Sequence, residues 1–174
     1  MRAALRVVVM GVSGAGKSTV GARLAERLGL PFADADSFHP PQNVAKMSAG
    51  VPLTDDDRLP WLDAIGAHLA SSRDGAVVTC SALRRAYRDR LRAACPDGVR
   101  FVHLAGAREV IAARQAARRD HFMPPSLVES QFATLEPPEG DEPDVAVLDV
   151  SPPPEEVARA ARAALLGEGA TADR

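Results

Sequence analysis

A glycine-rich segment near the N-terminus constrains the fold of this chain more than any other feature. Residues 11–18 read GVSGAGKS and fit the pattern GxxxxGK followed by Ser or Thr. The preceding residues 5–10, LRVVVM, form an apolar run typical of a strand buried on both faces of a parallel sheet. Residues 19–28 carry apolar side chains at helical spacing, and Gly29 ends the pattern. Strand, loop and helix in this order predict a phosphate-binding loop.

Each residue type in this loop has a use in binding a nucleotide. The glycines allow backbone N–H groups to converge on phosphate oxygens, and the start of the following helix adds a favourable dipole. Lys17 would reach the β and γ phosphates, and the Ser18 hydroxyl would bind Mg²⁺. We therefore expect nucleotide contacts from the whole segment: Gly11, Val12, Ser13, Gly14, Ala15, Gly16, Lys17, Ser18 and Thr19.

The rest of the chain alternates strand and helix patterns, which predicts an α/β doubly wound sheet. The expected strands after the first are 31–34, 76–80, 100–104 and 145–150, and the expected helices after the first are 55–72, 84–95, 107–118, 125–135 and 154–166. We expect one domain over residues 1–167 and a flexible tail at 168–174. Two segments interrupt the alternation, a polar one at about 35–60 and one rich in Arg and Pro at about 118–126. Insertions at such places lie over the carboxyl ends of the strands, where ligands bind.

The composition excludes several other classes of protein. Lys and Arg number 21 and Asp and Glu number 23, so the net charge of −2 argues against a nucleic-acid binder or a polybasic membrane binder. No apolar run approaches the ~20 residues of a membrane helix, and the N-terminus lacks a signal-peptide pattern. We expect a cytoplasmic protein without membrane contact. Cys80 and Cys95 lack metal-ligand spacing, which favours reduced, structural thiols.

A phosphate-binding loop alone permits a GTPase, an ATPase or a small-molecule kinase. The chain has no NKxD element for guanine, and its DxxG match at 63–66 falls inside an expected helix. The strand expected at 76–80 ends without the Asp that often holds the Mg²⁺ shell. Asp34, at the end of the second strand, would take that role, and Asp36 would face the acceptor as general base or orienting group. The alternative is that both aspartates are turn residues; the first interpretation indicates a kinase that phosphorylates a hydroxyl.

Four segments resemble gluconokinases, the small P-loop type that phosphorylates D-gluconate to 6-phospho-D-gluconate. They are GVSGAGKST at 11–19, DADSFHPPQNVAKMSAGVPLTDDDRLPWL at 34–62, CSALRRAYRDRLR at 80–92 and HFMPPSLVESQFATLEPP at 121–138. The resemblance implies a fold like that of nucleoside monophosphate kinases, with a five-stranded parallel sheet, an acceptor-binding region at about 35–60 and a lid at about 118–126. It also implies ATP, Mg²⁺ and D-gluconate as ligands, and a possible homodimer. One departure is Asp120, where the family usually has glycine.

The residues expected to bind the acceptor follow from the same resemblance and from the acceptor's chemistry. A carboxylate needs a cation, and Arg58 and Arg84 are the candidates because guanidinium binds carboxylate through two parallel hydrogen bonds. The segment Thr54 to Asp57 also reads as a helix start, with Thr54 as N-cap. The resemblance further implies contacts from Asp36, His39, Asn43, Ser81, His121 and Gln131. Outside that motif, His39 and His121 would be read as structural, as are His68 and His103.

Basic residues before the lid are expected to act on the phosphates. Arg114 and Arg118 are four apart and so share a helix face. Arg118 would stabilise charge on the transferring phosphoryl group, and Arg114 would stack on adenine opposite Pro152 or Pro153, as in related kinases. The alternative is a solvated basic face.

Two competing functions stay open. Shikimate kinase shares the loop and the Asp-x-Asp element, but CSAL at 80–83 replaces its glycine triplet. A nucleotide-sensing protein without turnover is the other alternative.

Overall fold

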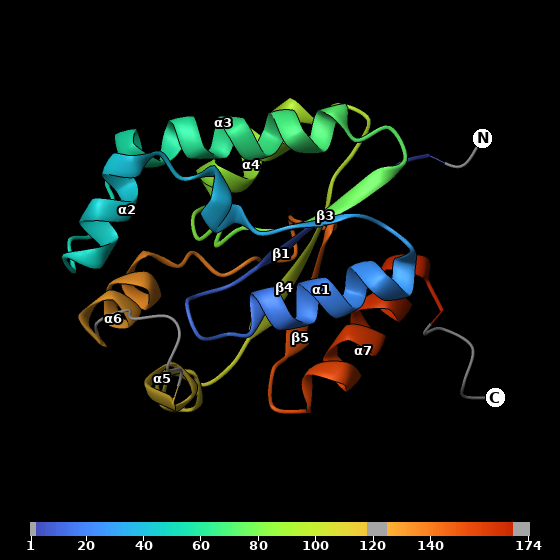
Figure 1. Ribbon diagram of the computed structural model, residues 1–174. Coiled ribbons are helices and arrows are strands. Elements are labelled where there is room, and N and C mark those ends of the chain that lie inside the picture. The colour runs from blue at the N-terminus through green and yellow to red at the C-terminus, as the bar shows by residue number, and fades with distance from the viewer. Residues whose placement is uncertain (1–2, 118–124, 169–174) are drawn as a thin grey trace.

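The computed structural model of the protein describes residues 3–117 and 125–168 (Figure 1). Strands and helices alternate along most of the chain, as the sequence predicts. In order, the elements are β1 Leu5–Met10, α1 Lys17–Leu28, β2 Phe32–Ala33, a 3-10 helix η1 Ala35–Phe38, α2 Pro41–Ser48, α3 Asp55–Ser71, β3 Gly75–Thr79, α4 Arg85–Ala94, β4 Arg100–Ala105, α5 Arg108–Ala117, α6 Pro125–Thr134, β5 Val145–Asp149 and α7 Pro154–Leu166.

The five strands form one parallel sheet in the order β2-β3-β1-β4-β5. β1 lies at its centre, with Val7 paired to Val77 of β3 and Val9 paired to Val102 of β4. All strands therefore point the same way, and the loops that follow them open at one edge of the sheet. The expected P-loop fold, with a five-stranded parallel sheet and flanking helices, is confirmed.

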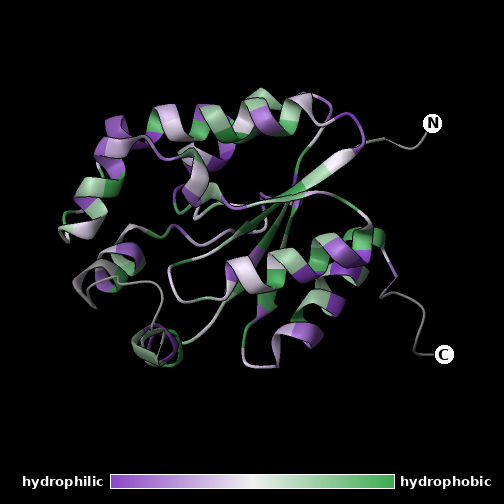
Figure 2. Cartoon of the chain, in the orientation of Figure 1, coloured by the Kyte–Doolittle hydropathy of each residue, from purple (hydrophilic) through white to green (hydrophobic). Residues whose placement is uncertain are grey.

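Side chains of β1 alternate between two hydrophobic cores. Val7 and Val9 pack into the core beneath α1 and α7, whereas Val8 and Met10 pack into the core beneath α3 and α4. Figure 1 shows these two helix pairs on opposite faces of the sheet, and Figure 2 shows hydrophobic residues concentrated along the strands between them. Burial on both faces explains the continuous apolar run of this strand. No helix in the described ranges is long and apolar enough to cross a membrane.

The segment at 35–60 contains more structure than the sequence indicated. It holds the 3-10 helix η1 and the eight-residue helix α2 before α3 begins. The pair Pro40 and Pro41 reads as a loop, but Pro41 takes the first helical position, where its missing N–H costs nothing. β2 is shorter than expected, because the side chain of Asp34 accepts a hydrogen bond from the Asp36 amide and starts η1.

We predict that Gly66→Ala destabilises the protein although alanine favours helices. A Cβ at Gly66 in α3 would lie 2.7 Å from the Cβ of Ala94 in α4. We expect a net loss of about 1 to 3 kcal/mol in the free energy of unfolding, because overpacking exceeds the roughly 1 kcal/mol gain in helix propensity. Urea denaturation measures it.

Gly21→Ala in α1 is the matched control. Its Cβ would lie 2.9 Å from the ring of Phe32 and 3.2 Å from the methyl group of Thr79, but Phe32 is 36% exposed and its ring can move aside. Gly66→Ala should therefore cost more than Gly21→Ala, and an equal or smaller loss would contradict the close packing of α3 on α4.

Candidate active site

The glycine-rich loop joins the central strand to α1 at the carboxyl edge of the sheet. Gly14 has φ 85°, and a Cβ there would lie 3.0 Å from the carbonyl oxygen of Ile111 in α5, so a side chain is excluded by conformation and by space. Gly16, at φ 92°, is the N-cap of α1, which has no side-chain cap. The helix therefore begins at Lys17, two residues earlier than the sequence pattern indicated. Its amino end opens toward the loop, as anion binding requires.

Lys17, Ser18 and Asp34 lie together at this end of α1. The Lys17 ammonium donates to the carbonyl oxygens of Gly11 and Val12, both at 3.0 Å, so the lysine lies over its own loop. The Ser18 hydroxyl donates to Asp34 Oδ2 at 2.5 Å. Burial alone would raise the pKa of Asp34, but bonds from Ser18, the Asp36 amide and Thr79, with the charge of Lys17, lower it. Asp34 is therefore an anion at neutral pH.

The pair of Ser18 and Asp34 fits a Mg²⁺ site. Both present oxygen atoms, and Mg²⁺ is usually held by one or two protein oxygens together with phosphates and water. Within the described ranges there is no group of three or more His, Cys, Asp or Glu side chains that could hold a metal without such help. These two residues are the ones the sequence predicted as metal ligands.

A cavity of about 360 Å³ lies beside the loop. One part of its wall is polar and comes from the loop, from the residues after β2 and from the end of β3. Another part is formed by α2 and the segment after it, with Val44, Met47, Val51, Pro52 and Leu53. Of the predicted site residues, the cavity is lined by Ser13, Gly14, Gly16, Lys17, Ser18, Asp34, Asp36, His39, Arg58, Ser81 and Gln131.

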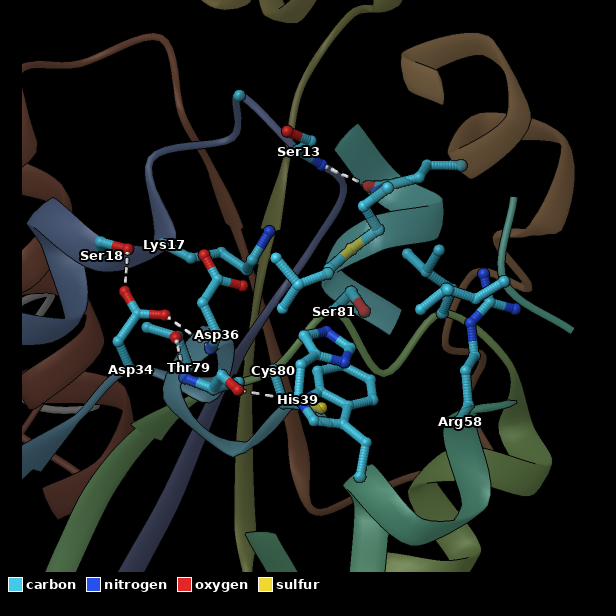
Figure 3. A pocket seen from close by; sticks show the side chains of 18 of the residues that line it. Ser13, Lys17, Ser18, Asp34, Asp36, His39, Arg58, Thr79, Cys80 and Ser81 are labelled. Atoms are coloured by element: carbon cyan, nitrogen blue, oxygen red, sulfur yellow. Dashed lines mark hydrogen bonds between the residues drawn. The ribbon is translucent and has the colours of Figure 1, made fainter. Parts of the chain in front are cut away.

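The charged residues of the cavity are spread along it. In Figure 3, Ser18 and Asp34 lie at one side, Lys17 and Asp36 lie next to them, and Arg58 lies at the other side. Arg58 donates to the Tyr87 hydroxyl at 2.8 Å, and its guanidinium lies 5.3 Å from the centre of the Tyr87 ring. A ligand in the cavity would therefore have a carboxylate partner at one end and a guanidinium at the other.

His39 forms part of the wall between these ends. Its ring stacks on Trp61 with centroids 4.2 Å apart and an angle of 8° between the planes. Burial, together with the charge of Arg58, lowers the pKa of His39 to about 4. The imidazole is therefore neutral at neutral pH. Trp61 itself is buried and donates to the carbonyl of Ala35, which agrees with its expected packing role.

Several predicted residues lie away from the cavity wall. Asn43 is fully buried and donates to the carbonyl of Asp57, so it joins α2 to the start of α3. Arg84 forms an ion pair with Asp55 at 3.4 Å. Arg114 donates to the carbonyl of Val150 at 2.8 Å. The other predicted residues that are not among those lining the cavity are Gly11, Val12, Ala15 and Thr19.

Three further expectations concern residues 118–124. Arg118, Asp120 and His121, with most of the expected lid, lie outside the described residues. The roles of Arg118 and His121 stay predictions.

The aspartates that precede Arg58 make different contacts within the protein. Thr54 is the N-cap of α3, as predicted, and it forms a reciprocal capping box with Asp57. A hydrogen bond from Lys46 lowers the pKa of Asp57 to about 2, with help from the Thr54 amide. Asp55 accepts hydrogen bonds from Tyr87 and Arg84 instead. Asp55 and Asp57, close to Arg58 in the sequence, are therefore engaged by groups of the protein.

The cavity is also lined by residues that were not among the predicted site residues: Thr79, Cys80 and Gln115. Thr79 accepts a hydrogen bond from the Ala35 amide at 3.1 Å and so fixes the turn after β2. Gln115 of α5 is buried against Gly14, four residues after the buried Ile111, and that helical spacing was its only signal. Cys80 lines the cavity, but burial raises its pKa to about 12, so its thiol is unreactive. Cys80 and Cys95 are free and buried, as expected.

One contact joins α6 directly to the glycine-rich loop. Gln131 Oε1 accepts a hydrogen bond from the Ser13 amide at 2.6 Å. Backbone amides of this loop are the groups that bind phosphate in proteins with this motif. In the structure, Gln131 therefore occupies an amide of the loop.

The loop after the first strand, the oxygen pair at Ser18 and Asp34 and the deep cavity beside them define a P-loop kinase. The family model described as "Shikimate kinase" matches residues 13–136. The chain is 51% identical to "Gluconokinase" of Gluconobacter oxydans over 81% of this chain and 80% of that protein. It is 45% identical to "Thermoresistant gluconokinase" of Escherichia coli over 86% of this chain and 87% of that protein.

A solved structure agrees. The crystal structure of a gluconokinase from Sinorhizobium meliloti 1021 has a TM-score of 0.88 and 52% identity, and covers 97% of this chain and 95% of that chain. The chain belongs to the gluconokinase family, within the wider group of kinases that the shikimate kinase model also matches. The resemblance found in the sequence is confirmed.

We predict that His39 makes stability depend on pH. A folded pKa of about 4 against an ordinary value of 6.5 means that the unfolded chain binds more protons between these values. The free energy of unfolding should therefore fall as pH drops from about 6.5 to about 4. His103, whose pKa burial also lowers to about 4, contributes in the same direction.

His39→Phe keeps a ring on Trp61 and removes the titration. Denaturant unfolding at several pH values should show a shallower loss of stability in this variant than in the parent protein. Identical pH profiles would contradict the neutral, buried state of His39.

We also predict that Gln131→Met increases nucleotide affinity. The change removes the side-chain oxygen that accepts a hydrogen bond from the Ser13 amide. A phosphate group would then bind this amide without competition from Gln131. A net hydrogen bond of roughly 0.5 to 1.5 kcal/mol corresponds to about two- to tenfold in the dissociation constant. Calorimetry without an acceptor measures it. The control is Glu129→Gln, which changes a residue of the same helix as Gln131 and removes its exposed ion pair with Arg108 of α5. Weaker nucleotide binding by Gln131→Met would contradict the competition.

Proposed function

We propose that this protein transfers the γ-phosphoryl group of ATP to the terminal primary hydroxyl of D-gluconate, forming 6-phospho-D-gluconate. The observation that carries the proposal is the arrangement of charge along one cavity. The loop, Lys17 and Asp36 lie at one side, and Arg58 lies at the other. The membership of this chain in the gluconokinase family supports the choice of D-gluconate as the substrate.

The loop side of the cavity would bind the nucleotide. Backbone amides and Lys17 would hold the phosphates, and Ser18 with Asp34 would hold Mg²⁺. Bound there, ATP supplies the phosphoryl group and Mg²⁺ neutralises part of its charge. Arg114 remains our candidate for adenine stacking. It is fixed to the carbonyl of Val150, close in sequence to Pro152 and Pro153.

Asp36 would act on the acceptor hydroxyl. It lines the cavity next to Lys17. Asp34 differs from it, because the Asp34 side chain caps the 3-10 helix η1. As the new oxygen–phosphorus bond forms and ADP leaves, the hydroxyl proton would pass to Asp36, or Asp36 would orient the hydroxyl for in-line attack. Arg118 would stabilise the charge on the transferring group.

The far side of the cavity would recognise the substrate's carboxylate. Arg58 presents a planar guanidinium, already oriented by Tyr87, and such a group binds a carboxylate through two hydrogen bonds. His39 and Ser81 lie along the wall between the two ends and would contact hydroxyl groups of the chain. A substrate with a carboxylate at one end and a primary hydroxyl at the other fits this order of groups.

We predict that the enzyme distinguishes gluconate from glucose, which lacks the carboxylate. A coupled assay of ADP release with gluconate, shikimate, glucose or no acceptor should show turnover with gluconate above all others. Arg58→Ala should raise the KM for gluconate by about tenfold or more, since a charge-assisted hydrogen bond contributes roughly 1.5 to 3 kcal/mol. The KM for ATP should change little.

Arg84→Ala is the comparison variant. Because Arg84 is not among the residues that line the cavity, its loss should have the smaller effect on gluconate. Shikimate turnover exceeding gluconate turnover would favour the alternative kinase. ADP release that is independent of any acceptor would overturn the proposal.

A further inference from the structure

Arg88 of α4 is fully buried, and each of its five N–H groups has a partner. Its Nε donates to Glu142 Oε2 at 2.8 Å, and Nη2 donates to Glu142 Oε1 at 2.7 Å and to the carbonyl of Glu136 at 3.0 Å. Its Nη1 donates to the carbonyls of Ala82 at 2.9 Å and Leu83 at 3.2 Å. A guanidinium has five N–H donors, so its capacity is fully used.

The partner carboxylate is committed to this contact. Glu142 is 5% exposed. Each of its two carboxylate oxygens accepts a hydrogen bond from Arg88, and Oε2 also accepts one from Arg92. The hydrogen bonds from Arg88 lower the pKa of Glu142 to about 2. A buried, ionised pair with every donor used holds its surroundings in one arrangement.

Two of the three carbonyls that Arg88 holds, those of Ala82 and Leu83, belong to the turn after β3. Ala82 has φ 45°, and it is the one residue other than glycine with positive φ in the described ranges. An alanine in this region is strained and needs surrounding contacts to stay there. Arg88 supplies them from one side, and the Glu136 amide donates to the carbonyl of Leu83 at 2.8 Å from the other.

This turn forms part of the cavity wall. Ser81 and Leu83, on either side of Ala82, both line the cavity. The carbonyl of Ser81 also accepts a hydrogen bond from the Gly11 amide at 3.3 Å, which ties the turn to the start of the phosphate-binding loop. The place of Ser81 relative to the loop therefore depends on the backbone of the turn.

We propose that Arg88 is a positioning residue for the acceptor, which fixes the turn at 81–83 so that Ser81 faces the acceptor beside the phosphate-binding loop. The proposal rests on the proposed function. Arg88 is not among the residues that line the cavity; it acts through the turn. Its loss should therefore weaken acceptor binding and leave nucleotide binding intact. Lysine cannot replace it, because a single ammonium with three donors cannot serve three carbonyls and a carboxylate fork.

Arg92 provides a matched control one turn further along α4. Its guanidinium bonds the same carboxylate, Glu142, at 2.7 Å and also Asp144 and Asp89. Its hydrogen bonds within the described part of the chain go to carboxylates and not to the turn. Arg88→Lys and Arg92→Lys therefore each remove a two-bond fork from one network, the first buried on Glu142 and the second partly exposed on Asp144, and only the first releases the turn.

The experiment compares these two variants with the parent protein. Arg88→Lys should raise the KM for gluconate by about tenfold or more and leave the dissociation constant for nucleotide, measured by calorimetry, within about twofold, as expected for loss of one or two hydrogen bonds at the acceptor alone. Arg92→Lys should leave both within about twofold. Equal KM changes in the two variants, or a nucleotide affinity that falls together with gluconate affinity, would overturn the proposal.

A rescue variant separates positioning from stability. Glycine adopts φ 45° without the strain of a Cβ, so Ala82→Gly in the Arg88→Lys background should recover part of the lost gluconate affinity. No recovery, with both proteins folded, would count against the turn as the intermediary. If Arg88→Lys does not fold, the double variant Arg88→Gln, Glu142→Gln, which leaves no unpaired buried charge, takes its place in every measurement.

Hydrogen exchange keeps this test independent of the substrate. Amides at 80–85 should exchange faster in the Arg88 variant than in the Arg92 variant, whatever acceptor the enzyme uses. If the parent protein does not phosphorylate gluconate, the proposed function fails, and exchange then decides on Arg88. If the parent protein phosphorylates gluconate but a folded Arg88 variant has an unchanged KM for gluconate, the positioning role of Arg88 is overturned and the proposed function stands.

Discussion

The burial of β1 between β3 and β4 is the constraint on which the rest of the structure depends. Because all strands of the sheet are parallel, their carboxyl ends lie at one edge, and β1, β2 and β3 are each followed by a candidate functional segment. The glycine-rich loop follows β1, Asp34 follows β2, and Ser81 follows β3. Groups far apart in the chain thus meet around one cavity without any local sequence signal for their proximity.

Charge at this edge is kept in place by short-range contacts within the protein. Asp34 is held as an anion by Ser18 and by the amide of Asp36, and His39 is held neutral by burial and Arg58. Neighbouring residues thus have opposite environments, because Asp34 faces donors and His39 faces a ring and a cation. A cavity with fixed charges at its ends can orient a polar ligand without rearranging at the moment of reaction.

Long-range hydrogen bonds hold together the segments around the cavity. Asn43 joins α2 to the start of α3, and Arg88 joins the turn after β3 to the segment after α6. Both side chains are fully buried and neither lines the cavity. Asn43 was predicted as an acceptor contact, yet its described contacts, like those of Arg88, are with protein groups. Polar residues of this kind support a site through other residues.

The sequence by itself determined the phosphate-binding loop, the five strands and the helix start at Thr54, because each is specified by neighbours within a few residues. Only the tertiary structure showed that Arg84 pairs with Asp55 away from the cavity, that α2 forms part of the cavity wall and that Gln131 bonds the Ser13 amide. These contacts join residues far apart in the chain. Their partners are chosen by packing and by the need to satisfy buried polar groups, which no local pattern records.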